Sequence, residues 1–157
     1  MAGIWGRLIT KVVQSLALLR RAMTLGVRIA AFNQNGEVLL VRHTYLTGWY
    51  LPGGGVDLGE CLQDAARREL FEECGAITDE PLQLKAVYLN NRRGTGRDHV
   101  ALYQANNVAI DSTWQRPSKE IAETGFFALN ALPKGITRAT QQRLLELAGD
   151  GPYDSIW

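Results

Sequence analysis

The chain has 157 residues, 46% of them hydrophobic and 21% charged, and its formal net charge is +1. This length favours one domain with a substantial core and is short for two. A net charge so close to zero gives no electrostatic reason to expect nucleic acid as a partner. Because the sequence has no run of about 18 apolar residues, it predicts no transmembrane helix.

A basic amphipathic helix is predicted at about residues 3–22, where apolar residues recur at helical spacing. Five basic residues and no acidic ones precede Glu37. We expect the apolar stripe to pack against the chain's own domain or against a second copy in a homodimer; an anionic membrane surface is the alternative. The pair Arg20-Arg21 follows the apolar part, which argues against a secretory signal.

Two runs typical of β-strands follow, at residues 24–33 and 37–43. Between them, Asn33-Gln34-Asn35-Gly36 is a hairpin turn signal.

A short strand at residues 49–51 leads into Pro52 and three consecutive glycines. Glycine lets the backbone approach a ligand closely, so a binding turn is expected here. Tyr45 and Trp49 lie just before it and are candidates to line a base or sugar pocket, because aromatic rings stack on bases. For Trp49, packing in the core is the alternative.

Residues 60–74 predict a helix, since they contain no Gly or Pro and are rich in good helix formers. Gly75 is placed to end it. At about 100° per residue, one stripe of this helix begins with small apolar residues and ends in three carboxylates: Leu62, Ala65, Ala66, Glu69, Glu72 and Glu73. The apolar start should face a sheet.

Three like charges on a packed face cannot all stay ionised without compensation. Either their pKa values rise or cations neutralise them, and carboxylates at i, i+3 and i+4 suit Mg²⁺ or Mn²⁺. Arg68, four residues before Glu72, can orient or partly neutralise an acid. A solvated acidic face is the alternative.

Cys61 and Cys74 lie on the same predicted helix. The helix rise separates them by about 20 Å, which is too far for a disulfide. They are interpreted as reduced thiols of a cytoplasmic protein.

The rest of the chain predicts three more strands and a closing helix, with strands at residues 83–91, 98–108 and 125–129 and the helix at 137–148. Strands before, between and after helices indicate an α/β protein with a mixed sheet and helices on both faces. The expected organisation is an N-terminal helix, one central domain and a short tail, at residues 1–23, 24–149 and 150–157.

The spacing from Gly54 to Ala76 resembles the Nudix box, G-x5-E-x7-R-E-U-x-E-E-x-G-U, where U is a bulky aliphatic residue. The matching residues are Gly54, Glu60, Arg68, Glu69, Leu70, Glu72, Glu73 and Gly75. Ala76 departs from the final aliphatic position. A second family element, E-x-x-E-x-x-[WF]-F-x4-L-P, is matched from Glu120 to Pro133. The resemblance covers roughly residues 24–148 and implies an α/β/α sandwich.

The resemblance also implies a hydrolase that uses Mg²⁺ or Mn²⁺ to cleave the pyrophosphate bond of a nucleoside diphosphate linked to another moiety. The implied metal ligands are Glu69, Glu72 and Glu73, with a backbone carbonyl of Gly53 or Gly54. The family places an arginine like Arg68 so that it fixes the first glutamate.

Two roles stay open at this point. The general base is Glu69 or Glu120. Glu60 is expected in the first turn of the helix, where it either stabilises the helix N-terminus or takes part in catalysis.

For the substrate we expect a nucleotide sugar, because residues 42–55 resemble the same stretch of nucleotide-sugar hydrolases and the markers of other subclasses are missing. A (d)NTP or ADP-ribose pyrophosphohydrolase is the alternative, as is a nucleotide sensor without catalysis, although every box acid is present. Arg92, Arg93 and Arg97 on a glycine-rich loop are candidates to grip a terminal phosphate, the alternative being a solvated hairpin loop. The expected partner is a small nucleotide.

Overall fold

The computed structural model describes residues 22–91, 96–149 and 152–157. The predicted N-terminal helix therefore lies outside the described residues, apart from its last position. Arg92 and Arg93 also lie outside them.

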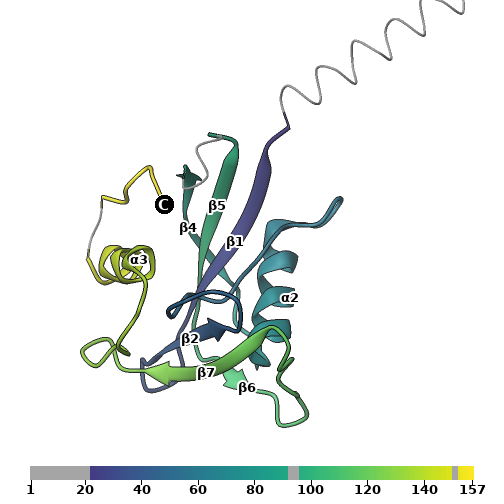
Figure 1. Cartoon of the computed structure of the whole chain (residues 1–157), viewed down its shortest axis with the longest axis vertical. Helices are drawn as coiled ribbons and strands as arrows, with labels where there is room; N and C mark the ends of the chain where they lie inside the picture. The colour runs from purple at the N-terminus through teal and green to yellow at the C-terminus, as the bar shows by residue number, and fades with distance from the viewer. Residues whose placement is uncertain (1–21, 92–95, 150–151) are drawn as a thin grey trace, which may run out of the picture.

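The main sheet has three strands in the order β1-β5-β4 (Figure 1). β1 (Thr24–Ala31) pairs parallel with β5 (Asp98–Ala105), and β5 pairs antiparallel with β4 (Gln83–Asn90). The sheet is thus mixed, as predicted. β1 is the strand that carries the glycine turn on its other edge, where Val27 N–H donates to the Gly54 carbonyl at 2.9 Å and Ile29 N–H to the Pro52 carbonyl at 2.9 Å.

Two smaller pairings close the lower part of the molecule in Figure 1. β2 (Val38–His43) pairs antiparallel with β7 (Ile121–Phe127), and β3 (Ala76–Ile77) with β6 (Ala109–Ile110). β7 begins four residues before the strand predicted at 125–129, and the short strand at residues 109–110 was not predicted.

The expected hairpin between β1 and β2 is only partly correct. The turn forms, with Gly36 N–H donating to the Asn33 carbonyl at 3.0 Å. Beyond a single bridge between Phe32 and Val38, however, the two strands separate and join different sheets. The turn residues fix the reversal of the chain, whereas partners distant in sequence decide where each strand pairs.

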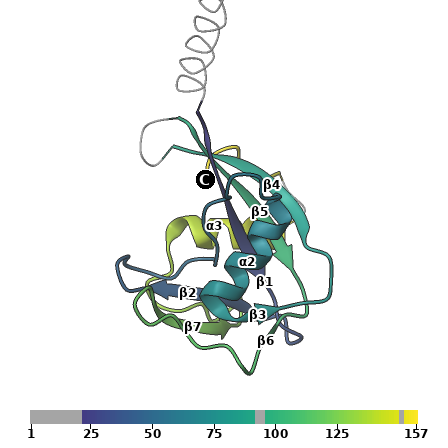
Figure 2. The ribbon, with the colours of Figure 1, turned by 90° about the vertical axis from the view of Figure 1, so that its right-hand side faces the viewer.

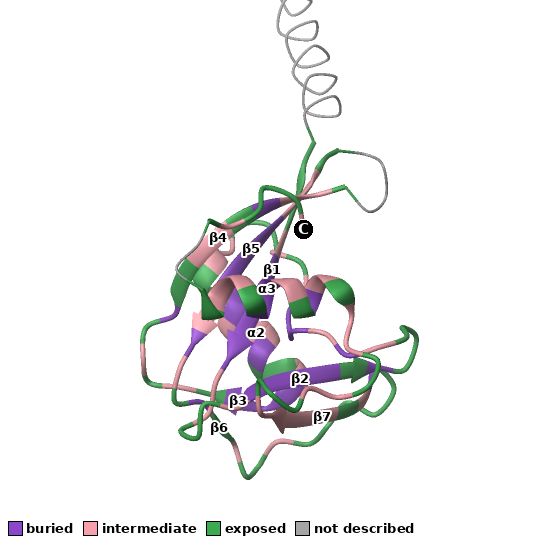
Figure 3. Cartoon of the chain, turned by 90° about the vertical axis from the view of Figure 1, so that its left-hand side faces the viewer, coloured by how far each residue is buried: buried purple, intermediate pink, exposed green. Residues whose placement is uncertain are grey.

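Two helices cover opposite faces of the main sheet, α2 (Leu62–Cys74) on one side and α3 (Arg138–Ala148) on the other (Figures 1 and 2). Each face has its own apolar cluster. β1 alternates between them, since Val27 and Ile29 pack with α2 while Ala30 packs with α3. The buried residues follow β1, β5 and β2 through the interior (Figure 3).

The C-terminal tail packs against this framework, which the sequence did not predict. Leu89 N–H of β4 donates to the Ser155 carbonyl at 2.9 Å, and Trp157 N–H donates to the Leu89 carbonyl at 3.0 Å. The Trp157 ring then meets Tyr88 edge-on, with centroids 5.4 Å apart. The tail therefore continues the sheet next to β4.

Candidate active site

The acid-bearing helix begins and ends close to where the sequence predicts. Ala65 and Ala66 are fully buried against the sheet. Gly75 ends the helix with φ 65°, and its N–H bonds to carbonyls of the last turn. Trp114 fills the space where a side chain on Gly75 would stand, so this position requires glycine for its conformation and for the room it leaves.

The glycine turn is in direct contact with two of the three acids. Gly53 N–H donates to Glu73 Oε2 at 2.8 Å. A Cβ on Gly54 would lie 2.6 Å from Glu69 Oε1, so any larger residue would displace that carboxylate. The turn also packs closely on β1. A side chain on Gly53 would stand 2.1 Å from the Val27 carbonyl, so this close packing requires glycine. β1, the turn and α2 thus position Glu69 and Glu73 together.

Arg68 links the acids on the other side of the helix. Its Nε and Nη2 donate to the two oxygens of Glu60 at 2.8 and 2.9 Å, a bidentate pair. Nη1 donates to Glu69 Oε1 at 2.7 Å and to Glu72 Oε2 at 3.2 Å, and Nη2 also reaches the Gly55 carbonyl at 3.0 Å. One guanidinium therefore joins the turn, the segment before the helix and two acids on the helix.

Glu60 does not lie in the first turn of the helix as expected. The helix begins at Leu62 with Cys61 as its N-cap, so Glu60 precedes it. Its carboxylate accepts from Asp57 N–H at 3.0 Å as well as from Arg68. These hydrogen bonds lower the pKa of Glu60 to about 2, with Arg68 as the main cause. Glu60 is thus an ionised anchor for Arg68.

Glu73 is in a very different environment, because its side chain is 14% exposed and no arginine or lysine of the described residues pairs with it. Burial raises its pKa to about 7, while the Gly53 N–H and the positive charge of Arg28 act in the opposite direction. The one basic side chain of the described residues within ion-pair distance is His43, with Nε2 3.6 Å from Glu73 Oε1. Burial lowers the pKa of His43, so that histidine is neutral at pH 7 and does not neutralise the acid.

A cavity of about 490 Å³ opens over the three box acids. Glu69, Glu72 and Glu73 line it from the helix, and Glu120 lines it from the segment before β7. Tyr45, a predicted substrate contact, also lines it. The structure therefore brings together both candidate bases and all three predicted metal ligands.

The donor set suits a hard divalent cation. It consists of carboxylate oxygens, and Glu73 is a largely buried carboxylate that has no cationic partner among the described residues. The carboxylates do not form a preassembled cage: no three of the Asp, Glu, His and Cys side chains in the described segments converge closely enough to hold an ion as they stand. Glu69 and Glu72 are turned towards Arg68, and Glu72 is at the rim, 57% exposed.

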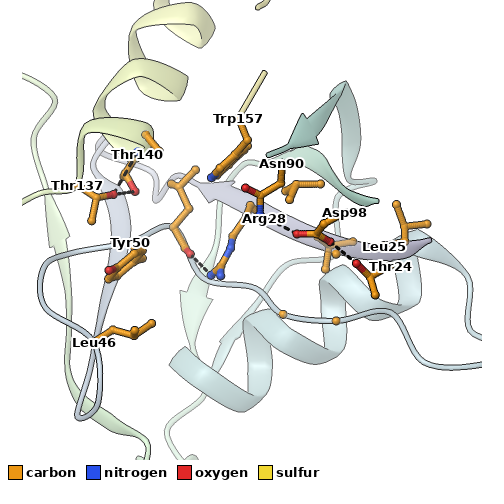
Figure 4. A pocket seen from close by; sticks show the side chains of 17 residues that line it. Thr24, Leu25, Arg28, Leu46, Tyr50, Asn90, Asp98, Thr137, Thr140 and Trp157 are labelled. Atoms are coloured by element: carbon orange, nitrogen blue, oxygen red, sulfur yellow. Dashed lines mark hydrogen bonds between the residues drawn. The ribbon is translucent and has the colours of Figure 1, made fainter. Parts of the chain in front are cut away.

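A second cavity of about 440 Å³ lies on the α3 side of β1 (Figure 4). Tyr50, Trp157 and the hydroxyls of Thr137 and Thr140 border it. At its far end, the Asp98 carboxylate accepts from Thr24 and Asn90, both at 2.7 Å. Aromatic rings with hydroxyl and carboxylate groups are features of a pocket for a base and a sugar.

Three residues border both cavities: Arg28, Leu46 and Gly54. Arg28 is the charged one, and Figure 4 shows its guanidinium reaching towards the glycine turn. The two cavities therefore meet at the turn that positions Glu69 and Glu73.

Two predicted substrate contacts are placed elsewhere. Trp49 lies in the core, 7% exposed, with its ring against Phe127 at 5.0 Å, so it lines neither cavity. Its backbone bridges to Ile136, and both residues pack in the apolar cluster on the α3 side of the sheet. Arg97 is exposed beside the start of β5 and also lines neither cavity.

Sequence reasoning missed Arg28, Tyr50, Thr137 and Trp157. One signal was present for Arg28: it is a charged residue inside the otherwise apolar run V-R-I-A-A-F. The other three come from segments that meet only in the folded chain.

The family model of the NUDIX domain matches residues 23–147, most of the chain. The chain belongs to this family, the Nudix hydrolases. The prediction made from the box, an enzyme of the pyrophosphohydrolase kind, is confirmed. Use of a divalent metal such as Mg²⁺ or Mn²⁺ is general in the family.

Among its relatives, an RNA pyrophosphohydrolase of Bartonella bacilliformis is 48% identical over 134 residues, a match that covers 69% of this chain and 79% of the relative. A putative 8-oxo-dGTP diphosphatase of Bacillus subtilis is 42% identical over 52 residues, a match that covers 33% of this chain and 35% of that protein.

The crystal structure of a MutT NUDIX hydrolase from Burkholderia pseudomallei has a TM-score of 0.64 and 28% identity, covering 78% of this chain and 95% of that one. The predicted Nudix α/β/α fold is thereby confirmed. No helix among the described residues is both long and apolar enough to cross a membrane.

Proposed function

We propose that this Nudix hydrolase cleaves the pyrophosphate linkage of a nucleoside diphosphate joined to another group, with the nucleoside in the cavity beside α3 and the reacting phosphates over the box acids. The observation that carries the proposal is the junction of the two cavities at the glycine turn. A substrate lying across this junction would place its diphosphate next to Glu69 and Glu73.

The metal would be held by Glu69, Glu72 and Glu73, with a carbonyl of the glycine turn. Of the two glycines, Gly53 is the better candidate, because the Gly54 carbonyl already accepts from Val27 N–H. The ion supplies positive charge that offsets the phosphates and lowers the pKa of bound water.

The remaining residues act on position and charge. Arg68, fixed by Glu60, holds Glu69 in place from one side while Gly54 confines it from the other. Gly53 N–H fixes one oxygen of Glu73 and leaves the second directed towards His43. The acids are thus held in position by contacts that do not depend on the substrate.

For the general base, Glu69 and Glu120 remain the candidates, and both line the cavity. Glu69 is 14% exposed and accepts a hydrogen bond from Arg68, whereas Glu120 is exposed on the opposite wall. We propose Glu120, because the Glu69 carboxylate is already engaged by Arg68 and confined by Gly54, whereas the Glu120 side chain is exposed to the cavity. Glu120→Gln should then lower kcat without changing Mn²⁺ affinity, while Glu69→Gln should change both.

The group joined to the nucleoside diphosphate is the next question. The first candidate is a third phosphate, so that the substrate is a 5′-triphosphate, either of a free nucleoside or at the end of an RNA. The supporting similarity to an RNA pyrophosphohydrolase extends over 134 residues. The expectation that nucleic acid is not a partner is therefore open to test. A nucleotide sugar, the substrate predicted from residues 42–55, is the second candidate, supported by that stretch alone.

The deciding experiment is a panel of nucleoside triphosphates, 5′-triphosphorylated RNA, nucleotide sugars and ADP-ribose, incubated with Mg²⁺ or Mn²⁺. Phosphate release is measured with inorganic pyrophosphatase as the coupling enzyme for the triphosphates, and with alkaline phosphatase for the nucleotide sugars and ADP-ribose, which have no terminal phosphate. Turnover of at least one nucleoside diphosphate derivative, abolished by EDTA, is expected. Nucleotide sugars turning over tenfold faster than every triphosphate would establish the second candidate instead.

Glu73→Gln is the matched inactive variant for this panel. Replacing the buried carboxylate removes a proposed ligand charge and should cut kcat at least 100-fold, roughly 3 kcal/mol. Near-normal turnover with metal still bound would contradict the assignment of Glu73.

A further inference from the structure

Arg28 lies where the two cavities meet. Of the three residues that border both cavities it is the charged one, and among the described residues no other lysine or arginine lines either cavity. A substrate extending from the nucleoside cavity to the acids would have to pass it.

Its side chain is held, but most of its donors are not used. β1 places Arg28 on the α3 face, between Val27 and Ile29 of the opposite face. Nη1 donates to the Leu51 carbonyl at 2.9 Å, which fixes the guanidinium beside the turn. Within the described parts of the chain it makes no ion pair and no other hydrogen bond, although a guanidinium carries five N–H donors.

The charge of Arg28 acts across the junction. It interacts electrostatically with both Glu73 and His43, which line the acid cavity. An isolated positive charge here makes the neck between the cavities attractive to an anion, although the acid cavity itself repels one.

We propose that Arg28 binds the phosphate attached to the nucleoside and so sets how far the diphosphate reaches into the acid cavity. This inference rests on the proposed function and adds a substrate contact outside the box. A guanidinium suits this role because its planar fork binds two phosphate oxygens at once. With one donor anchored on Leu51, the fork is oriented before the substrate arrives.

Binding can be measured without turnover by using the non-hydrolysable α,β-methylene diphosphates of adenosine and guanosine, in Mg²⁺, by calorimetry. The variants are Arg28→Met, Arg28→Lys and the control Arg42→Met. Arg42 is also a strand arginine, but it pairs with Glu123 on the surface, away from both cavities.

Arg28→Met should weaken binding of the preferred methylene diphosphate at least tenfold, and Arg28→Lys should recover part of the loss because it restores charge but not the fork. Arg42→Met should change binding less than twofold. The corresponding nucleoside, which has no phosphate, should bind the wild type and Arg28→Met equally. Mn²⁺ binding should also be equal in both proteins, and melting temperatures show that the variants are folded.

Methylene-diphosphate affinity within twofold of wild type in a folded Arg28→Met variant would overturn the inference while leaving the proposed function standing. The experiments also distinguish the reverse case, in which the proposed function fails and the Arg28 contact holds. If no substrate in the panel is hydrolysed but the diphosphate affinity still depends on Arg28, the proposed hydrolysis fails and the phosphate contact stands.

Discussion

At the scale of single residues, two neighbouring glycines of the site differ in how much space surrounds them. Gly54 is in contact with the Glu69 carboxylate, whereas a Cβ on its neighbour Gly55 would meet no atom within 4 Å. Neither has a positive φ, so alanine is compatible with the backbone at both positions. Comparing alanine substitutions at Gly54 and Gly55 therefore distinguishes crowding of Glu69 from a general effect of replacing a glycine.

We predict that Gly54→Ala lowers kcat at least tenfold, about 1.4 kcal/mol, and weakens Mn²⁺ binding, because the new methyl displaces Glu69. Gly55→Ala should keep both within about twofold. Steady-state kinetics and Mn²⁺ titration measure the two quantities. Equal effects of the two substitutions would show that crowding of Glu69 is not the cause.

A second residue-scale prediction concerns pH. Glu73 has a folded-state pKa of about 7, above the ordinary value of 4.5, because it is buried. Between these values the folded protein holds the proton and the unfolded chain releases it, so the stability of the metal-free protein falls as pH rises through this window. The cost at pH 8 is on the order of 3 kcal/mol at most.

In EDTA, Glu73→Gln should therefore melt at a higher temperature than wild type, with a gap that widens from pH 5 to pH 8. Glu72→Gln, at the exposed rim, is the control and should show no such widening. Thermal denaturation at the two pH values measures the gap. A gap of the same size at both pH values would mean that burial does not raise the pKa of Glu73 in the metal-free protein.

At the scale of elements, the tail and α3 stabilise each other through Arg143, which is 1% exposed. Arg143 donates to the Ile156 carbonyl at 2.8 Å and to Glu146 at 2.7 Å, and its guanidinium lies 4.3 Å from the centre of the Tyr88 ring. Without the tail, a buried charged group loses a hydrogen-bond acceptor.

Removing residues 155–157 should therefore destabilise the protein by about 2–3 kcal/mol, roughly 5–10 °C in melting temperature. It should also weaken nucleoside binding, since Trp157 borders that cavity. Leu145→Ala, on the exposed side of the same helix, is the control and should cost less than about 0.5 kcal/mol. Calorimetry of the two variants measures these changes. An unchanged melting temperature after truncation would contradict the packing of the tail on α3 and β4.

Local patterns were enough to predict the elements that carry the chemistry. The helix at 60–74 followed from composition, its period and Gly75, and the three acids followed from their spacing. What could not be predicted depends on contacts distant in sequence. The parallel partner of β1 decides where Arg28 lies, the pairing of β4 with the tail brings in Trp157, and core packing takes Trp49 away from the site.

At the scale of the whole molecule, the domain boundaries at residues 23/24 and 149/150 stay a prediction, as does the packing of the N-terminal segment. We predict that removing residues 1–22 lowers the melting temperature or dissociates a dimer, because a predicted apolar stripe needs a protein surface to cover it. Metal binding should be unchanged. Calorimetry and light scattering test this. A truncated protein with unchanged melting temperature and mass, whose full-length parent pellets with anionic vesicles, would favour the membrane surface instead.

The pairing of β1 with β5 also has a consequence for synthesis on the ribosome. Thr24 lies opposite Asp98, 74 residues later, and Val38 of β2 lies opposite Phe127. Both early strands are thus made long before their partners, and the glycine turn that cradles the acids is fastened to one of them. A nascent chain cannot assemble the site stepwise from its first half, so the site should appear only when the domain folds as a single cooperative unit.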